Sequence, residues 1–285
     1  MSINSIGIIG AGTMGNGIAQ VCAAAKINVV MVDISTEAVQ RGLGAIAKSL
    51  DRLIKKEKLS AAEKAAILER IKGTTDYADL ASADLVIEAA TENTSLKLRI
   101  LQELDAILNK DGIIATNTSS ISITKLAAAT KRPQKFIGMH FFNPVPLMAL
   151  VELIAGLETD DETLGKVQEF MKIIGKTSIV AKNMPGFVVN RILCPMINEA
   201  VFALQEGLAS AEDIDTGMKL GCNQPIGPLA LADLVGLDTL LSVMDVFYTS
   251  FNDPKYRPAP LLQEMVDAGY LGQKAGRGFY RYDQR

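Results

Sequence analysis

The sequence is poor in several residue types, with one histidine, three cysteines and no tryptophan among its 285 residues. Cys22, Cys194 and Cys222 are odd in number and show no CxxC spacing, which argues against a disulfide framework and against a zinc site. We therefore expect buried structural thiols, no bound metal ion, and a reducing compartment, the cytoplasm.

A strong charge of one sign and long hydrophobic runs are also missing. The formal net charge is −3, so nothing in the electrostatics predicts nucleic acid or an anionic membrane as a partner. No run reaches the ~18 uninterrupted apolar residues of a membrane-spanning helix, and the N-terminus lacks the basic region of a secretory signal. With 48% hydrophobic residues, the chain suits one large or two ordinary domains with a buried core.

A glycine-rich turn near the N-terminus directly follows an apolar run. Residues 6–9 predict a strand, residues 10–15 have the spacing GxGxxG, and a second apolar run at 28–32 ends in Asp33. Strand, glycine turn, helix, strand and acid in this order predict a dinucleotide-binding βαβ unit, whereas the glycine motif alone would fit a flexible loop equally well. The residues expected to contact the cofactor in this turn are Gly10, Ala11, Gly12, Thr13, Met14 and Gly15.

Each part of this unit has a physical role. Gly10 permits the tight turn, Gly12 lets the backbone approach a pyrophosphate, and Gly15 lets helix and strand pack closely. Asp33 stands where a carboxylate would accept hydrogen bonds from an adenosine ribose, and Ile34 rather than an arginine follows it. Because a 2′-phosphate would meet a like charge there, we expect NAD(H) rather than NADP(H).

Beyond this unit, strand-like runs alternate with helical periodicity as far as residue 183. The expected strands are 85–89, 112–116, 136–140, 150–154 and 177–181. This alternation predicts an α/β fold, a Rossmann-like doubly wound sheet, over residues 1–183. The loop between 136–140 and 150–154 is too short for a crossover helix, so we expect this pair to form an antiparallel addition at the sheet edge.

The stretch from about 36 to 72 is longer than a simple βαβ connection needs. It shows helical periodicity over 37–56 and a capping box at Ser60–Glu63, which starts a second helix running to Ile71. We therefore expect an inserted helical hairpin that projects from the nucleotide-binding domain.

Strand signals stop after residue 183, and residues 184–285 predict an all-helical C-terminal domain. Its apolar helices exceed what the core of a domain of this size would hide, which indicates a subunit interface and a homodimer. The expected helices are 187–206, 211–220, 229–251 and 259–269.

The single histidine, His140, ends one of the expected strands, where ligands of open α/β sheets bind. Histidine exchanges a proton readily near neutral pH, although a capped core histidine is an alternative. Glu152 interrupts an apolar run in which an unpaired charge would be costly to bury. If the chain turns back after His140, Glu152 returns beside it and can orient the imidazole. An outward-facing residue of an edge strand is the alternative for Glu152.

Two further polar side chains are candidates for substrate contact. Ser119 follows the expected strand at 112–116, so its hydroxyl could face the same crevice as His140; a helix N-cap at this serine pair is the alternative. Asn190 lies on the first helix after residue 183, where it could meet substrate in an interdomain cleft, or simply lie on the helix surface.

Taken in order, the motifs of this chain resemble those of the 3-hydroxyacyl-CoA dehydrogenase family, especially its bacterial short-chain members. The resemblance covers the chain from about residue 5 to 282, and GMHFFNPVP and PGFVVNR are its most specific motifs. The others are GIIGAGTMG, VIEAATEN, NTSSIS, LVELI, DIDTGMKLG, GPLALADLVGLD and GQKAGRGFY.

The resemblance implies reversible, NAD-dependent oxidation of an (S)-3-hydroxyacyl-CoA, with 3-hydroxybutyryl-CoA and acetoacetyl-CoA as the expected pair, by a homodimer of the helical domain. It makes His140 the catalytic base, Glu152 its carboxylate partner, and Ser119 and Asn190 the residues that contact the substrate. The residues that it places along the nicotinamide half of the cofactor, besides Ser119, are Glu92, Lys97, Asn143 and Lys274. The residues that it places at coenzyme A are Ser49 and Lys56. Many relatives carry lysine where this chain has Ala149, which affects expectations about carrier or acyl binding.

Two other readings of the sequence remain. The 3-hydroxyacid and phosphogluconate dehydrogenases also join a Rossmann unit to a helical domain, but they use a lysine for acid–base chemistry. A nucleotide-binding structural protein could keep the fold without turnover, as some lens proteins similar to this family do. The presence of both His140 and Glu152 favours a 3-hydroxyacyl-CoA dehydrogenase over either alternative.

Overall fold

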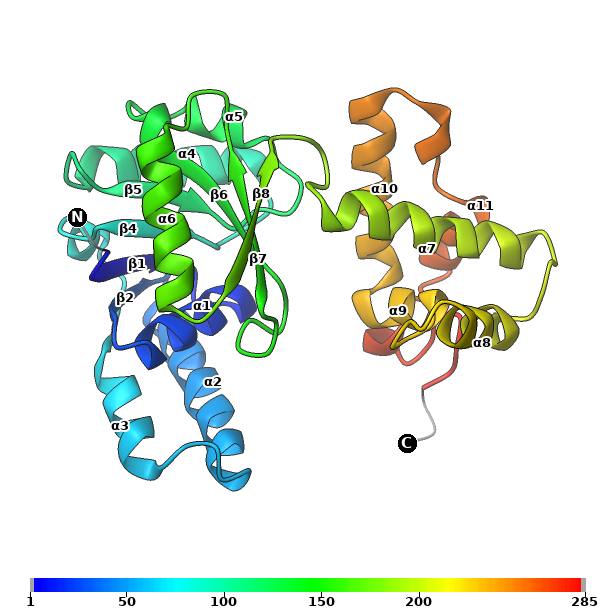
Figure 1. Cartoon of the computed structure of the whole chain (residues 1–285), viewed down its shortest axis with the longest axis horizontal. Coiled ribbons are helices and arrows are strands. Elements are labelled where there is room, and N and C mark those ends of the chain that lie inside the picture. Colours follow the sequence, from blue (N-terminus) through cyan, green and yellow to red (C-terminus); the bar gives the residue numbers. More distant parts are fainter. Residues whose placement is uncertain (1–2, 283–285) are drawn as a thin grey trace. The chain divides into compact units, whose positions relative to one another are not determined.

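The computed structural model describes residues 3–282, which form two compact units. The first unit ends at Met184 and the second begins at Pro185, and each is described by itself. The first contains an eight-stranded sheet in the order β3-β2-β1-β4-β5-β6-β7-β8 (Figure 1). Neighbouring strands are parallel except β6 and β7, which are antiparallel. The strands are β1 (Ser5–Ile9), β2 (Asn28–Val32), β3 (Ile71–Thr74), β4 (Leu85–Glu88), β5 (Ile113–Thr116), β6 (Phe136–Phe141), β7 (Leu150–Ala155) and β8 (Thr177–Lys182).

The helices of the first unit connect these strands. Side-chain caps fix where most of them begin: the hydroxyl of Ser35 accepts a hydrogen bond from the Ala38 amide at the start of α2, and Ser60 and Glu63 form the expected capping box of α3. The helices are α1 (Thr13–Ala24), α2 (Thr36–Lys55), α3 (Ala61–Glu69), α4 (Thr94–Ile107), α5 (Ile123–Ala127) and α6 (Asp161–Ile173), with short 3₁₀ turns η1 (Tyr77–Leu80) and η2 (Pro133–Lys135).

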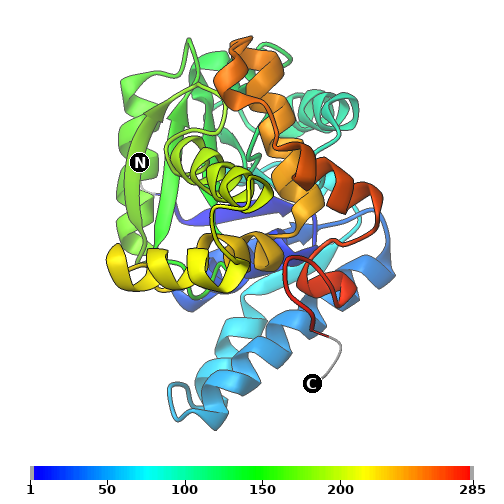
Figure 2. The same cartoon turned by 90° about the vertical axis from the view of Figure 1, so that its right-hand side faces the viewer.

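The predicted helical hairpin over 36–72 is partly wrong. Helices α2 and α3 lie side by side and extend beyond the sheet (Figures 1 and 2), but α3 ends at Glu69 and the following residues form the edge strand β3, parallel to β2. The sequence Ile71-Lys72-Gly73-Thr74 has too few apolar residues to predict a strand, and its pairing with β2 decides its conformation. The hairpin is therefore the connection between two neighbouring strands.

The predicted position of the antiparallel strand also needs correction. Strand β7 does pair antiparallel with β6, as expected, but it is not at the edge of the sheet. After β7 the chain runs through α6 and returns as β8, which pairs in parallel with β7 and forms the edge. Both sides of β7 are therefore covered by neighbouring strands.

The second unit is helical in most of its length, and its predicted helix over 229–251 is divided. Gly236 lies between α9 and α10, and its φ is +101°. Because an α-helix requires a negative φ, this glycine interrupts the helical backbone and divides the predicted helix in two. After the last helix, the carboxylate of Asp233 holds the C-terminal segment by accepting hydrogen bonds from the amides of Phe279 and Tyr280. The elements are α7 (Val189–Gln205), α8 (Ala211–Gly221), α9 (Pro228–Val235), α10 (Leu237–Phe251), η3 (Pro254–Tyr256), α11 (Pro260–Asp267) and η4 (Gln273–Ala275).

The thiols and the surface add two observations. Cys22 and Cys194 are buried, but Cys222 is exposed just after the end of α8, so the expectation of a buried thiol is wrong for that residue. Within residues 3–282, no helix is long and apolar enough to cross a membrane.

The glycine turn depends on close contact between backbone segments. A Cβ atom on Gly15 would lie 1.8 Å from the carbonyl oxygen of Gly10, so any side chain there forces the turn and the start of α1 apart. We expect Gly15→Ala to destabilise the protein by about 1–3 kcal/mol, in the range of overpacking. Thermal unfolding, monitored by circular dichroism, measures the effect.

Gly44→Ala is the matched control, because Gly44 lies on α2 with nothing within 4 Å of the added carbon. Alanine there should leave stability unchanged or raise it by up to about 1 kcal/mol. Equal tolerance of the two substitutions would contradict the close packing of the turn.

Candidate active site

The glycine turn between β1 and α1 is shaped to receive a phosphate group. Gly10 has φ +102°, and a Cβ atom on it would lie 2.7 Å from both the carbonyl oxygen of Ala89 and the Cα atom of Ala90. At Gly12, which precedes the first residue of α1, no side chain caps the helix and nothing lies within 4 Å of an added Cβ atom. The start of α1 thus offers backbone N–H groups and open space, which fits the pyrophosphate of a dinucleotide.

Asp33 braces this turn from the end of β2. Its Oδ2 atom accepts a hydrogen bond from the Ala11 amide at 2.7 Å, and its Oδ1 atom accepts one from the Ile34 amide at 2.7 Å. The predicted contact between Asp33 and an adenosine ribose stays a prediction, but the carboxylate is next to the turn. Ile34 is 93% exposed and supplies no positive charge.

His140 and Glu152 face each other across the antiparallel pair of β6 and β7. They are direct partners in the strand register, and the His140 Nδ1 atom lies 2.7 Å from the Glu152 Oε2 atom. His140 is 6% exposed and Glu152 is fully buried. An ionised carboxylate only accepts hydrogen bonds, so Nδ1 donates to it, and in this tautomer Nε2 of a neutral imidazole is an acceptor. The alternative of an outward-facing Glu152 is wrong.

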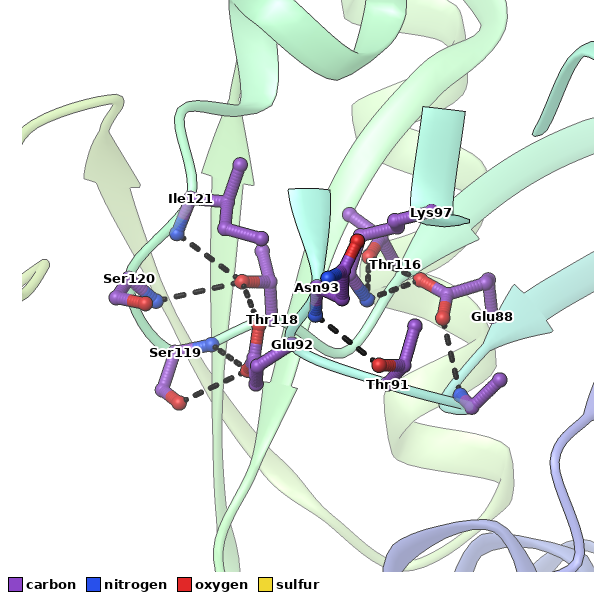
Figure 3. A network of polar contacts seen from close by, with 11 residues as sticks. Glu88, Thr91, Glu92, Asn93, Lys97, Thr116, Thr118, Ser119, Ser120 and Ile121 are labelled. Atoms are coloured by element: carbon purple, nitrogen blue, oxygen red, sulfur yellow. Dashed lines mark hydrogen bonds and ion pairs between the residues drawn. The ribbon is translucent and has the colours of Figure 1, made fainter. Parts of the chain in front are cut away.

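The Ser119 loop follows β5 and is held by Glu92. The Glu92 carboxylate accepts hydrogen bonds from the Thr118 hydroxyl at 2.8 Å, from the Ser119 amide at 2.9 Å and from the Ser119 hydroxyl at 3.1 Å (Figure 3). Ser122, not Ser119, caps the next helix, α5, so the alternative of an N-cap at Ser119 is wrong. The predicted contact of Glu92 with the nicotinamide half of the cofactor stays a prediction.

The Ser119 loop is also joined to the strand that carries His140. Asn117, two residues before Ser119, accepts a hydrogen bond from the Phe141 amide through its side-chain Oδ1 atom at 2.9 Å. Strands β5 and β6 are parallel neighbours whose carboxyl ends meet at the same edge of the sheet. The structure therefore brings the Ser119 loop and the end of the His140 strand together.

Lys97, which the resemblance places along the cofactor, forms a buried ion pair with Glu88, and its contact with the cofactor stays a prediction. The Lys97 side chain is 1% exposed, and its Nζ atom donates to the Glu88 carboxylate and, at 3.4 Å, to the Thr116 hydroxyl. Sequence reasoning missed Glu88. The signal was present, because Glu88 is an acid in the apolar run Leu85-Val86-Ile87, the same signal that identified Glu152.

Asn143 lies exposed on the loop between β6 and β7, which two contacts hold. A Cβ atom on Gly17 of α1 would lie 2.9 Å from the Val145 Cβ atom, so the loop packs directly on α1. Lys176 donates to the carbonyl oxygens of Val145 and Met148, each at 2.6 Å, and burial lowers the pKa of its amine. The loop with Asn143 is thus fixed beside the helix of the glycine turn.

Four further predicted residues are on other elements. Ser49 is in the last two turns of α2 and Lys56 is its C-cap residue, on the hairpin of α2 and α3. Asn190 is on α7 of the second unit, and Lys274 is on η4, where it forms an ion pair with Asp238 at 2.6 Å. Burial alone would raise the pKa of Asp238, but the hydrogen bonds from Lys274 lower it. The roles of these four residues stay predictions.

The paired side chains of His140 and Glu152 offer acid–base chemistry. Among residues 3–282, no group of three or more His, Cys, Asp or Glu side chains is placed to hold a metal ion. A buried imidazole with one nitrogen fixed by a carboxylate and the other left as an acceptor can remove and return a proton.

Comparison with known proteins finds a family model for each part of the chain. The family model for the 3-hydroxyacyl-CoA dehydrogenase NAD binding domain matches residues 5–184, and the model for the C-terminal domain of the same family matches residues 186–282. The chain is 51% identical over 280 residues to a 3-hydroxybutyryl-CoA dehydrogenase from Bradyrhizobium diazoefficiens, covering 98% of this chain and 96% of the relative. It is 49% identical over 279 residues to one from Clostridioides difficile, covering 98% and 99%.

A solved structure shows the same architecture. The crystal structure of an (S)-3-hydroxybutyryl-CoA dehydrogenase from Ralstonia eutropha is similar to this chain with a TM-score of 0.98 and 67% sequence identity. The similarity covers 99% of this chain and 100% of that structure.

The position of Asp33 predicts selectivity between the two nicotinamide dinucleotides. We expect NADH to bind at least about tenfold more tightly than NADPH, equivalent to about 1.4 kcal/mol, because the 2′-phosphate would meet the Asp33 carboxylate. Fluorescence titration at fixed ionic strength measures both affinities.

Asp33→Asn removes the charge but keeps an oxygen that can accept the hydrogen bond from the Ala11 amide. This variant should bind NADPH more tightly than the wild type does, so that its affinities for NADH and NADPH become more similar. A wild-type protein that prefers NADPH would contradict the assignment.

Proposed function

Because the chain belongs to the 3-hydroxyacyl-CoA dehydrogenase family, we propose that it catalyses the reversible oxidation of an (S)-3-hydroxyacyl-CoA to the 3-ketoacyl-CoA with NAD as its cofactor. The observation that carries this proposal is the buried pair of His140 and Glu152, joined through Phe141 and Asn117 to the Ser119 loop. The residues around the glycine turn fit the dinucleotide that the reaction requires.

In this mechanism the residues of the chain move one proton and hold one oxygen atom. The bound NAD⁺ supplies the acceptor for the hydride that leaves C3 of the substrate. The Nε2 atom of His140 removes the proton of the 3-hydroxyl group, and returns it when the ketone is reduced. Glu152 fixes the imidazole tautomer and stabilises its protonated form, as the carboxylate does in a serine protease triad. The hydroxyl of Ser119 and the amide of Asn190 orient the reacting oxygen.

Short acyl chains are the proposed substrates. The support comes from relatives at 49% and 51% identity and a structure at 67% identity, all 3-hydroxybutyryl-CoA dehydrogenases by name. We assign 3-hydroxybutyryl-CoA and acetoacetyl-CoA to this chain, in fatty acid or butanoate metabolism. Ser49 and the exposed Lys56 would bind coenzyme A, whose phosphates suit the basic run at residues 55–58.

The buried lysines of the first unit do not favour a lysine-based dehydrogenase. The amine of Lys97 is tied to Glu88, and the amine of Lys176 donates to the two carbonyl oxygens of the loop after β6. Neither amine is placed as a proton acceptor for a substrate. The geometry of His140, with Nδ1 held by Glu152, fits a general base better than either of these two amines.

The second unit supports the proposal of a homodimer. Several of its large apolar side chains are exposed, which is typical of a surface covered by a partner. We propose that the two units act as a cofactor-binding domain over residues 1–183 and a dimerising, substrate-binding domain over 184–285, and that the enzyme works in the cytoplasm. The exposed side chains are Val188, Ile192, Leu208, Leu220, Leu234, Val235 and Tyr248.

Replacing the proposed base tests the mechanism. His140→Gln should lower kcat for the reduction of acetoacetyl-CoA with NADH by at least about 10², the contribution of a general acid–base group, and leave the affinity for NADH nearly unchanged. A spectrophotometric assay at 340 nm and a separate NADH titration measure the two quantities.

Glu152→Gln should also lower kcat strongly while NADH stays bound, because the imidazole loses the group that orients it. Leu157→Ser, at an exposed position of the first unit outside both the proposed chemistry and the proposed dimer surface, is the control and should keep the wild-type turnover. Turnover by His140→Gln close to that of the wild type would remove His140 from the role of base.

The proposed dimer predicts a mass in solution. One chain has a mass of 30.5 kDa, so light scattering coupled to gel filtration should give 2 × 30.5 = 61 kDa. Because an apolar interface is insensitive to salt, the mass should be the same in about 0.5 M sodium chloride. A mass of one chain at micromolar concentration would contradict the proposal.

A further inference from the structure

Three buried polar side chains form a network at the start of the Ser119 loop and of the loop that follows β4. Glu88 ends β4, Thr116 ends the neighbouring strand β5, and Lys97 lies in the first part of α4 (Figure 3). Glu88 and Thr116 are fully buried and Lys97 is 1% exposed. We call these three residues the Glu88 network.

Stability alone gives no reason for this network. Taking two opposite charges out of water costs several kcal/mol per ion, and their attraction in the interior often does no more than offset that cost. Apolar side chains of similar volume commonly make such a site equally or more stable. Charges kept in this position therefore call for another explanation.

Glu88 uses both carboxylate oxygens and its backbone to hold the two loops that follow β4 and β5. Its Oε1 atom accepts a hydrogen bond from the Ala90 amide at 2.9 Å, and its Oε2 atom accepts one from the Thr116 hydroxyl at 2.8 Å as well as the contact with Lys97. Its carbonyl oxygen accepts a hydrogen bond from the Asn117 amide at 2.8 Å. One residue thus fixes the start of both loops.

The segment over 89–93 lies between the glycine turn and the Ser119 loop. On one side Ala89 and Ala90 pack against Gly10, so closely that a Cβ atom on Gly10 would lie 2.7 Å from the Ala89 carbonyl oxygen. On the other side Glu92 holds the amide and the hydroxyl of Ser119. A shift of the segment at Ala90 would therefore move both the phosphate-binding turn and the serine.

We propose that the Glu88 network is a positioning device, which fixes the segment over 89–93 so that Glu92 holds Ser119 in the geometry that turnover requires. The inference rests on the function proposed above and adds Glu88, Lys97 and Thr116 as positioning residues. Lys97 compensates the buried negative charge of Glu88. Its predicted contact with the cofactor stays a prediction beside this role.

A double-mutant cycle separates this role from a structural one. Glu88→Leu and Lys97→Met each leave one uncompensated buried charge and should lower Tm by roughly 10 °C. The double variant E88L/K97M leaves none, so its Tm should return to within about 3 °C of the wild type. Its kcat for acetoacetyl-CoA should nevertheless stay at least about tenfold below the wild type, because Ala90 has lost its acceptor.

Hydrogen exchange of the cofactor-free protein gives a readout that does not depend on activity. The amides of Ala90 and Ser119 are held by Glu88 and Glu92, so both should exchange faster in the E88L/K97M variant. The amides of the strands β1 and β2 should keep the protection of the wild type. Mass spectrometry of peptides that cover 89–93 and 117–122 measures the change.

Asp105→Asn is the matched control, because Asp105 forms a part-buried ion pair with Arg132 toward the other end of α4. This variant should lower Tm and leave kcat within about twofold of the wild type. It shows whether destabilisation near α4 is by itself enough to lower turnover.

The outcomes distinguish the two proposals. A wild-type protein without turnover on any 3-ketoacyl-CoA defeats the proposed function, while hydrogen exchange still tests the network. An active wild type together with an E88L/K97M variant that keeps its turnover and the protection of Ser119 defeats the inference. Should the double variant fail to fold, Thr116→Val is the substitute, because it removes one hydrogen bond to Glu88 and leaves the charges of the network unchanged. Unchanged exchange at Ala90 and unchanged kcat in Thr116→Val would then overturn the inference.

Discussion

A carboxylate that is buried in a β-sheet needs a partner of suitable charge or hydrogen-bonding capacity, and this requirement organises the first unit. It is met twice, once where Glu152 on β7 faces His140 on β6, and once where Glu88 at the end of β4 meets Lys97 of α4. In each case the partner comes from a neighbouring element. Each pair therefore fixes the register or the approach of two elements, and both lie next to loops that carry candidate functional residues.

The two pairs differ in what they leave available. The imidazole of His140 has a second nitrogen, Nε2, so the bond from Nδ1 to Glu152 orients the ring and sets its tautomer. The amine of Lys97 donates hydrogen bonds to Glu88 and Thr116, at the ends of the strands β4 and β5. A buried ion pair can thus orient a side chain that exchanges protons, or it can support the loops around it.

Much of this arrangement follows from the sequence, and the exceptions have physical causes. The glycine turn and the His140–Glu152 pair were predictable because local patterns carry them: a fixed spacing of glycines, and an acid within an apolar run after a short loop. Glu88 carried the same signal as Glu152 but was missed, since its partner lies nine residues away on a helix rather than across a hairpin. Strand β3 was missed because four residues with little apolar content form a strand only through their pairing with β2. The break at Gly236 was hidden inside a continuous apolar pattern.

The residues proposed for proton transfer and those proposed for binding coenzyme A are on different elements of the first unit. The proposed base His140 and its carboxylate partner Glu152 are on two paired interior strands, where a shift of one residue would turn both side chains to the other face of the sheet. Ser49 and Lys56, the candidates for binding coenzyme A, are on a helical hairpin that extends beyond the sheet. Substitutions on the hairpin can alter affinity for the carrier group without changing the register of β6 and β7. Differences in acyl or carrier preference between relatives should therefore accumulate in the hairpin and in the second unit, while the strands that carry the proton-transfer pair tolerate little change.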